Sequence, residues 1–230
     1  MPYFIPANVS PHEFLSLIPP HFSSEHLFLI GLHTCGSLAS TMLRLFLEIS
    51  PIKIFVGVGC CYYKGDSQSM YPMSKFVASL KLEMGYNPLK LACEPYGQWC
   101  AFTEEERQYT LRRTFYRAIL EVILRDKMPG FEGKFIVRNV SKDKCNSIVE
   151  YVQECLKRLQ LNSAERVKSQ PDIKMLDDEI LEYYNKLLPY FPQLQVFFAI
   201  QMLIAPVIES FLILDRIIFL EEHEVNYILH

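Results

Sequence analysis

Two apolar segments of this sequence end in side chains that can carry proton-transfer or thiol chemistry. These residues are His33, Thr34 and Cys35 after the first segment, and Cys60, Cys61 and Tyr62 after the second. An imidazole titrates near neutral pH and can serve as a general base, whereas a thiol becomes a nucleophile or a metal ligand once it loses its proton. These six residues are therefore the first candidates for a functional site.

The two segments themselves are typical of neighbouring parallel strands. A continuous apolar run covers 26–32, a helical pattern starts after Ser37, and a β-branched apolar run covers 52–59. Strand, helix and strand at this spacing form a βαβ unit, and apolar strands without alternation favour a sheet that is covered on both faces. Ligands of such sheets bind beyond the carboxyl ends of the strands, so we expect both groups of candidates to face one crevice. Gly36 is expected to take a positive φ in the turn.

The rest of the chain is predicted to consist of loops and helices. A loop region covers 65–100 and contains a short helix from Ser74, for which Ser74 is a suitable N-cap. Longer helices are expected over 103–127, 142–159, 175–188 and 194–222, with a short strand over 134–138.

The longest of these helices combines an apolar stripe with a basic face. Thr103 and Glu106 form a capping box at its start. The inner stripe is expected at Leu111, Phe115, Ala118, Ile119 and Val122. The outer face is expected to carry Tyr109, Arg112, Arg113, Tyr116 and Arg117. Such a face can contact RNA phosphates, although a solvated helix surface is the more common role.

Charge and cysteine content exclude several classes of protein. The 230 residues carry a net charge of -3, so no overall basic field indicates a nucleic-acid-binding protein. Seven cysteines without a C-x-x-C pair form neither a readable disulfide framework nor a zinc ribbon. No secretory signal is recognisable, so we expect an intracellular location, cytoplasmic or nuclear. Charges and Pro206 interrupt the apolar segment 196–220, which predicts a buried, kinked core helix and no transmembrane segment.

Six motifs occur in the order found in one known family. They are GLHTCGSL (31–38), VGCCYYK (58–64), YPMS (71–74), LAC (91–93), FYRAILEVI (115–123) and LIAPVIESFLILDRIIFL (203–220). In these motifs the chain resembles the carboxyl half of the methyltransferase-like protein 25 family, which includes a relative once named ribosomal RNA adenine dimethylase domain-containing protein. The resemblance implies an α/β fold: a partial Rossmann-like, class I methyltransferase-like parallel sheet with a large helical insertion. It also implies S-adenosyl-L-methionine as the methyl donor.

The resemblance assigns roles to the candidate residues. His33 is the expected base or orienting residue, with Cys35 beside it in the catalytic group. The expected acceptor-binding residues are Thr34, Cys60, Cys61, Tyr62, Pro72, Met73 and Ser74. Structural alternatives stay open, because a histidine can simply end a strand, a thiol can pack as a small apolar group, and Ser74 can cap a helix. The methyl acceptor is unknown, and RNA and protein both stay open.

One part of the family pattern is missing from the sequence. The chain contains neither G-x-G-x-x-G nor D-x-G-x-G, the kind of turn that holds the cofactor in class I methyltransferases. We therefore assign no cofactor-binding residue and do not expect this chain alone to bind the cofactor productively. Because one βαβ unit is too small a sheet, we expect a fragment, with a partial sheet unit at 1–64 and a loop and helical region at 65–230. The alternative function is a non-catalytic interaction domain that has lost cofactor binding.

Three other chemistries receive less support from the sequence. A metal site is not predicted, because adjacent strand residues point to opposite faces, which would separate Cys60 from Cys61. A vicinal disulfide between them would be strained. A cysteine protease needs a cysteine with a base and an orienting group, and nothing beyond composition supports a pairing of His21, His26 or His33 with a cysteine. Glu209 and the Asp215–Arg216 pair lie within an apolar helix, where we expect polar groups with satisfied partners.

Overall fold

The computed structural model describes residues 9–18, 26–64, 70–130, 134–137, 140–162 and 173–228. The chain separates into two compact units. The first combines Met1–Tyr96 with Gln201–His230, and the second is Gly97–Ile200. The division predicted from the sequence, 1–64 and 65–230, separates the βαβ unit from the residues that follow it and does not describe compact units. It therefore stays a prediction.

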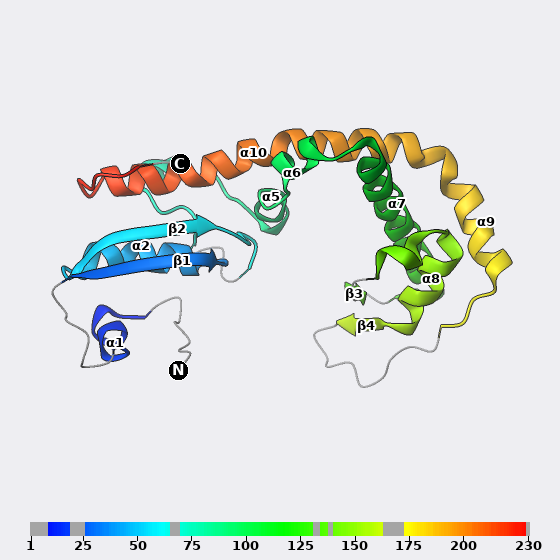
Figure 1. Cartoon of the computed structure of the whole chain (residues 1–230), viewed down its shortest axis with the longest axis horizontal. Helices are drawn as coiled ribbons and strands as arrows, with labels where there is room; N and C mark the ends of the chain where they lie inside the picture. Colours follow the sequence, from blue (N-terminus) through cyan, green and yellow to red (C-terminus); the bar gives the residue numbers. More distant parts are fainter. Residues whose placement is uncertain are drawn as a thin grey trace. The chain divides into compact units, whose positions relative to one another are not determined.

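The first unit is built on one βαβ motif (Figure 1). Strands β1 (Leu27–Thr34) and β2 (Ile52–Gly59) pair in parallel, and helix α2 (Leu38–Glu48) connects them and covers one side of the pair. In the ladder Ile30 lies opposite Val56. Among the described residues, this sheet has two strands. The predicted α/β fold with a partial parallel sheet is therefore confirmed, and the bounds of β2 are those predicted.

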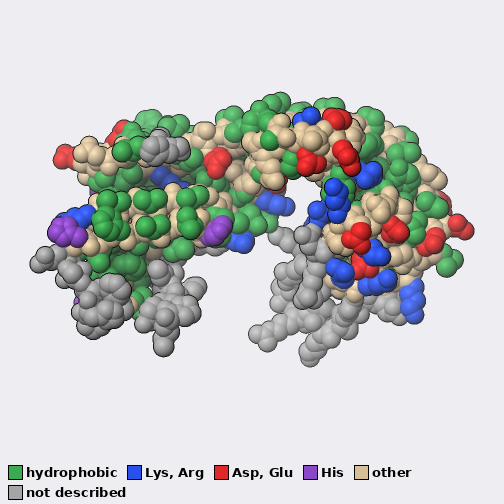
Figure 2. All heavy atoms as spheres, viewed as in Figure 1, with side chains coloured by type: hydrophobic (Ala, Val, Ile, Leu, Met, Phe, Trp, Pro, Cys, Tyr) green, Lys and Arg blue, Asp and Glu red, His purple; other side chains and the backbone are tan. Residues whose placement is uncertain are grey.

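Only one face of this sheet is buried. Leu45, Ile49 and Ile52 form the core beneath α2. On the other face, the apolar side chains are 47–68% exposed, and Figure 2 shows hydrophobic side chains in rows over β1 and β2. They are Phe28, Ile30, Leu32, Ile54, Val56 and Val58. The prediction that both faces are covered is therefore wrong for the part of the chain that the structure describes, where nothing packs on this second face.

The remainder of the first unit joins short helices to the carboxyl-terminal part of one long helix. The elements are α1 (Pro11–Ser16), α4 (Lys75–Ser79), α5 (Tyr86–Leu91) and α10 (Phe191–Glu221), of which α10 begins in the second unit. A second apolar cluster connects the segment after β2 with α10. Its buried members are Tyr62, Met70, Tyr71, Val77, Leu89, Ala92 and Leu212. This cluster fixes the region that directly follows the predicted site.

The second unit packs helices on a small hairpin-like sheet. Its elements are α6 (Tyr96–Ala101), α7 (Glu104–Lys127), β3 (Lys134–Val137), η1 (Lys142–Cys145), α8 (Ile148–Lys157), β4 (Leu159–Asn162), α9 (Asp177–Leu187) and η2 (Leu188–Tyr190). The capping box of Thr103 and Glu106 is present. Strand β3 pairs antiparallel with β4. The sequence missed β4, because the apolar pattern of α8 runs without a break into Leu159, which is buried in the same core.

The buried stripe of α7 differs from the predicted one. Its buried residues are Leu111, Phe115, Tyr116, Ile119, Leu120, Ile123 and Leu124. Tyr116, assigned to the basic outer face, is 6% exposed, whereas Val122, assigned to the stripe, is 39% exposed. Ala118 is exposed as well, and Tyr109 packs partly against the core. The buried stripe is rotated by about one residue relative to the predicted stripe, because the aromatic ring of Tyr116 is apolar enough to belong to the core.

The long helix α10 continues through Pro206 and leaves much of its apolar surface exposed. Leu203 and Val207 are 62% and 66% exposed, whereas Met202, Ala205 and Leu212 are buried. The stretch Asp177–Glu221 is long and apolar enough to cross a membrane by length and composition alone. A single helix of this kind is weak evidence for a membrane span, and the described residues contain no clear transmembrane segment. The predicted buried core helix is right only for one side of α10.

Candidate functional site

The two groups of candidate residues lie at the same edge of the sheet. Strand β1 extends two residues beyond the predicted run, so that His33 and Thr34 belong to it. The Thr34 Oγ1 hydroxyl donates a hydrogen bond to the Val58 carbonyl at 2.9 Å. Gly36 takes a φ of 58°, and its N–H donates to the Cys61 carbonyl at 2.8 Å. These bonds fix the turn after β1 against the segment that follows β2.

Three thiols and an imidazole converge at this edge. The Cys60 Sγ lies 3.6 Å from the Cys35 Sγ and 3.7 Å from the Cys61 Sγ. It also lies 3.6 Å from the His33 Nδ1. The expectation that Cys60 and Cys61 diverge is wrong. Strand β2 ends at Gly59, so the alternation of a strand no longer applies to the two residues after it.

Hydrogen bonds within the cluster shift the pKa values of two thiols in opposite directions. The pKa of Cys35 is lowered, first by a hydrogen bond with the Cys61 backbone and then by the hydrogen bond with the Cys60 side chain. The same hydrogen bonds with its two neighbouring thiols raise the pKa of Cys60 to about 11. The pKa of Lys64 is raised, first by the charge of Cys61 and then by that of Cys35. An exposed cation therefore lies within reach of the thiols.

Tyr62 points into the core rather than toward solvent. Its side chain is 3% exposed, and its hydroxyl donates to Glu209 Oε1 at 3.1 Å. The Arg216 guanidinium lies 5.3 Å from the centre of the Tyr62 ring. Burial is the largest cause that raises the pKa of Tyr62. Tyr62 thus anchors the strand end to α10, and its role toward an acceptor stays a prediction.

Cys93 is a contact of this site that sequence reasoning did not single out. Its Sγ accepts a hydrogen bond from the Tyr62 N–H at 3.2 Å. The Cys93 thiol in turn donates to the Cys60 carbonyl at 3.4 Å and to the Leu89 carbonyl at 3.2 Å. In the sequence, the only indication that Cys93 contributes to this site is its place in the LAC motif. Cys93 ties α5 to the segment that carries the thiols.

The loop residues Pro72, Met73 and Ser74 are attached to α10. The N–H groups of Met73 and Ser74 donate to the Asp215 carboxylate at 2.8 and 2.9 Å. Ser74 is buried and caps α4 by accepting a hydrogen bond from the Val77 N–H. The alternative that Ser74 caps a helix is therefore observed, and the acceptor role of these residues stays a prediction. Asp215 and Glu209 have the satisfied polar contacts that the sequence predicts.

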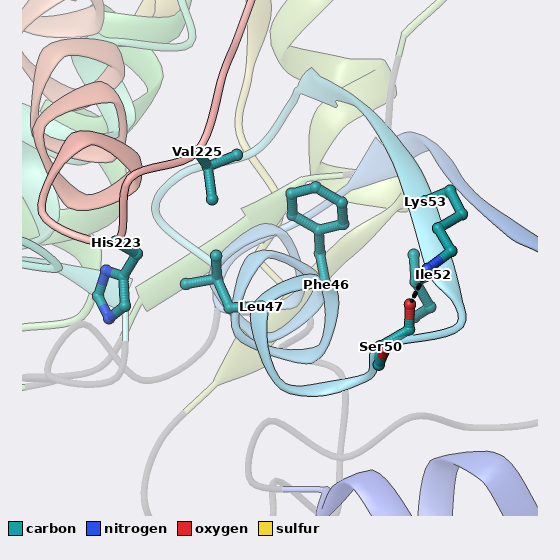
Figure 3. A pocket seen from close by; sticks show the side chains of 7 residues that line it. All are labelled: Phe46, Leu47, Ser50, Ile52, Lys53, His223 and Val225. Carbon is teal, nitrogen blue, oxygen red and sulfur yellow. Dashed lines mark hydrogen bonds between the residues drawn. The ribbon is translucent and has the colours of Figure 1, made fainter.

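A pocket of about 360 Å³ lies at the opposite end of the sheet (Figure 3). It is lined by Phe46, Leu47, Ser50, Ile52, Lys53, His223 and Val225. Ile52 is the first residue of β2, whereas the thiols follow its last residue. The Lys53 ammonium donates to the Ser50 carbonyl at 2.8 Å and so closes the turn before β2. None of the predicted site residues contributes to this pocket.

The βαβ unit and its strand ends are similar to a methyltransferase domain. Residues 13–68, which include β1, α2, β2 and all four clustered side chains, match the family model described as a methyltransferase domain.

The whole chain is similar to methyltransferase-like protein 25, which confirms the resemblance seen in the motifs. It is 29% identical over 238 residues to the probable methyltransferase-like protein 25 of Homo sapiens, with 96% of this chain and 35% of the relative covered. It is 28% identical over 239 residues to the Mus musculus protein of the same name, with 96% of this chain and 36% of the relative covered. The chain thus spans about a third of the length of the curated relatives it matches. No solved structure matches the chain.

Proposed function

We propose that this chain provides the acceptor side of an S-adenosyl-L-methionine-dependent methyltransferase domain. One observation carries the proposal. The side chains after β1 and β2 meet at the carboxyl edge of a parallel sheet, within the region that matches a methyltransferase domain. This edge is where ligands of open parallel sheets bind.

The residues present do not fit a cradle for the methyl donor. The turn after β1 contains a single glycine, Gly36, and β2 ends in Gly59 without an acidic residue after it. We therefore place the donor site on polypeptide that this sequence does not contain. The uncovered apolar face of β1 and β2 supports this proposal, because such a face needs a further layer of structure.

In this proposal His33 acts on the acceptor. Its side chain is exposed at the strand end, so it can orient an acceptor or remove a proton from a weakly acidic one. Methyl transfer otherwise requires alignment rather than covalent participation of the protein. Cys35 completes the catalytic pair, and the remaining acceptor contacts are those expected from the sequence. An RNA or a protein is the acceptor class, and the proposed location is intracellular.

The second candidate function is a non-catalytic interaction domain. The missing glycine-rich turn and the exposed apolar sheet face both favour it. It predicts that neither this chain nor a longer protein containing it binds the methyl donor.

Calorimetric titration of S-adenosyl-L-methionine separates the two functions. The titration is made into this chain, into the full-length human relative, and into this chain extended by the preceding region of that relative. We expect binding by the relative and by the extended chain, and none by this chain alone. Absence of binding by both longer proteins would overturn the methyltransferase proposal in favour of the interaction domain.

The role of His33 is tested in the extended chain with radiolabelled donor and total cellular RNA or protein as acceptor. His33→Gln should lower methyl transfer by about 100-fold, because general acid–base catalysis contributes about 10²–10⁴-fold. The affinity for the donor should not change. Equal methyl-transfer rates of the extended chain and its His33→Gln variant would exclude His33 as the base.

A further inference from the structure

We propose that Cys35, Cys60 and Cys61 bind one zinc ion, with His33 as the fourth ligand. The inference concerns the resting protein and does not depend on methyl transfer. Three sulfur atoms within 4.8 Å of one another form the core of the site. The spacing H-x-C followed by C-C lacks the C-x-x-C pair of common zinc motifs, so the fold rather than the local sequence creates the cluster.

Two of the three sulfur–sulfur distances match the edges of a zinc tetrahedron. With Zn–S bonds of about 2.3 Å, two sulfurs of a tetrahedral site lie about 3.8 Å apart. The Cys60 Sγ is 3.6 Å from the Cys35 Sγ and 3.7 Å from the Cys61 Sγ. These two edges of the tetrahedron are therefore already present. The third sulfur–sulfur edge, between Cys35 and Cys61, is no longer than 4.8 Å.

His33 is the nearest candidate for the fourth position. A Zn–N bond of about 2.0–2.1 Å places the nitrogen about 3.6 Å from a sulfur on the same ion. The His33 Nδ1 lies 3.6 Å from the Cys60 Sγ. Because the His33 side chain is exposed, a rotation about its side-chain bonds can bring the ring toward the other two sulfurs. A metal-bound His33 is a ligand at Nδ1 rather than a base. The base role of His33 and the catalytic and acceptor roles of Cys35, Cys60 and Cys61 therefore apply to the metal-free protein.

The backbone holds the ligands in place without a metal. The Cys35 N–H donates to the His33 carbonyl at 2.9 Å, and the Gly36 N–H donates to the Cys61 carbonyl at 2.8 Å. On the other side, the Cys60 carbonyl accepts from the Tyr62 N–H at 3.1 Å. A site that is preformed in this way loses little conformational freedom when the ion binds.

The surroundings suit a thiolate-rich site. All four donors are sulfur or imidazole nitrogen, a set that favours zinc over magnesium or calcium. Binding requires that each thiol release its proton to solvent, after which three thiolates and Zn²⁺ carry one net negative charge. Lys64 lies close enough to Cys61 and Cys35 to offset that charge. The three cysteines are half-buried, which leaves a route for the ion.

Oxidation is the competing fate of the same cluster. The three cysteines are free thiols, yet sulfurs 3.6 or 3.7 Å apart can form a disulfide when an oxidant removes two electrons and the two thiol protons are released. A disulfide would consume two ligands and abolish the metal site. Zinc binding and disulfide formation are therefore distinguished by measuring the zinc affinity of the reduced protein.

Metal titration of the whole reduced chain tests the proposal. Zinc is titrated against a chromophoric chelator, and Co²⁺ is used as a spectroscopic substitute. We expect one equivalent of each ion per chain, with visible cobalt bands of a tetrahedral site and ultraviolet thiolate-to-cobalt absorption. The proposal would be overturned if zinc did not bind stoichiometrically, or if the cobalt spectra were those of an octahedral oxygen site.

Matched variants locate the site on the chain. Cys35→Ser and Cys60→Ser should each weaken zinc binding by more than about 100-fold. Substitution of residues that only hydrogen-bond to metal ligands already lowers metal affinity by about 10–100-fold. Cys100→Ser is the control, since Cys100 is exposed on α6 and outside the cluster. Unchanged zinc affinity in the Cys35 and Cys60 variants would exclude the site. Unchanged affinity in His33→Gln would exclude His33 as the fourth ligand, and circular dichroism verifies that each variant is folded.

Discussion

The carboxylate of Asp215 and the amino-terminal cap of α4 are joined through Ser74. Asp215 Oδ1 accepts a hydrogen bond from the Ser74 N–H at 2.9 Å and another from the Ser74 hydroxyl at 2.7 Å. The second carboxylate oxygen accepts from the Met73 N–H at 2.8 Å. Asp215 and Ser74 are each 1% exposed. A charged group is thus buried in α10 with hydrogen bonds that replace its lost hydration.

The first prediction follows from this arrangement. Asp215→Ala should lower the free energy of unfolding by about 3 kcal/mol, because it removes charged hydrogen bonds and leaves buried N–H donors without an acceptor. Ser74→Ala should cost less, since both backbone N–H groups keep their acceptor. Urea unfolding followed by circular dichroism measures both values. A control is Asp178→Ala, because Asp178 is exposed in the first turn of α9. If Asp215→Ala were no more costly than this control, the inferred role of Asp215 would be wrong.

A second prediction concerns the register of α7. Ile123 is 0% exposed and belongs to the core of the second unit, whereas its neighbour Val122 is 39% exposed. Ile123→Ala should destabilise the protein by about 2–5 kcal/mol through lost burial and a residual cavity. Val122→Ala should cost less than about 1 kcal/mol. Thermal or urea denaturation of the pair measures the difference, and a larger effect at Val122 would favour the stripe predicted from the sequence.

The sequence predicts the local elements well and their packing poorly. The run 52–59 coincides with β2, and the capping box at Thr103 starts α7 as expected. Periodicity cannot tell, however, whether an apolar strand is covered on one face or two, because coverage depends on what else packs there. The convergence of Cys60 and Cys61 was missed for a related reason. Alternation holds only while the ladder continues, and the ladder ends at Gly59.

A third prediction uses the uncovered face of the sheet. Ile30 is 64% exposed on this face, whereas the adjacent Leu29 packs beneath α2 on the other. Ile30→Lys should reduce binding of a hydrophobic fluorescent dye and raise solubility, because it interrupts an exposed apolar patch. Leu29→Lys should destabilise the fold, since it brings a charge to the packed face. Dye fluorescence and unfolding curves of the two variants check this, and equal destabilisation by both would show that the face of Ile30 is covered in solution.

The last prediction concerns the acid stability of the first unit. Glu222 accepts hydrogen bonds from the Lys75 N–H at 2.9 Å and the Phe76 N–H at 3.0 Å, at the start of α4. The bond from the Lys75 backbone is the largest cause that lowers the pKa of Glu222. A carboxyl group with a lowered folded-state pKa stabilises the protein above its unfolded pKa of about 4.3, and this contribution is lost as the pH falls through the folded-state pKa. The stability difference between the native protein and Glu222→Gln should therefore be present near neutral pH and shrink in acid.

Urea unfolding across this pH range measures the stability difference, with Asn226→Gln as a neutral control nearby. A difference that stays constant as the pH falls would contradict the assigned role of the Glu222 carboxylate.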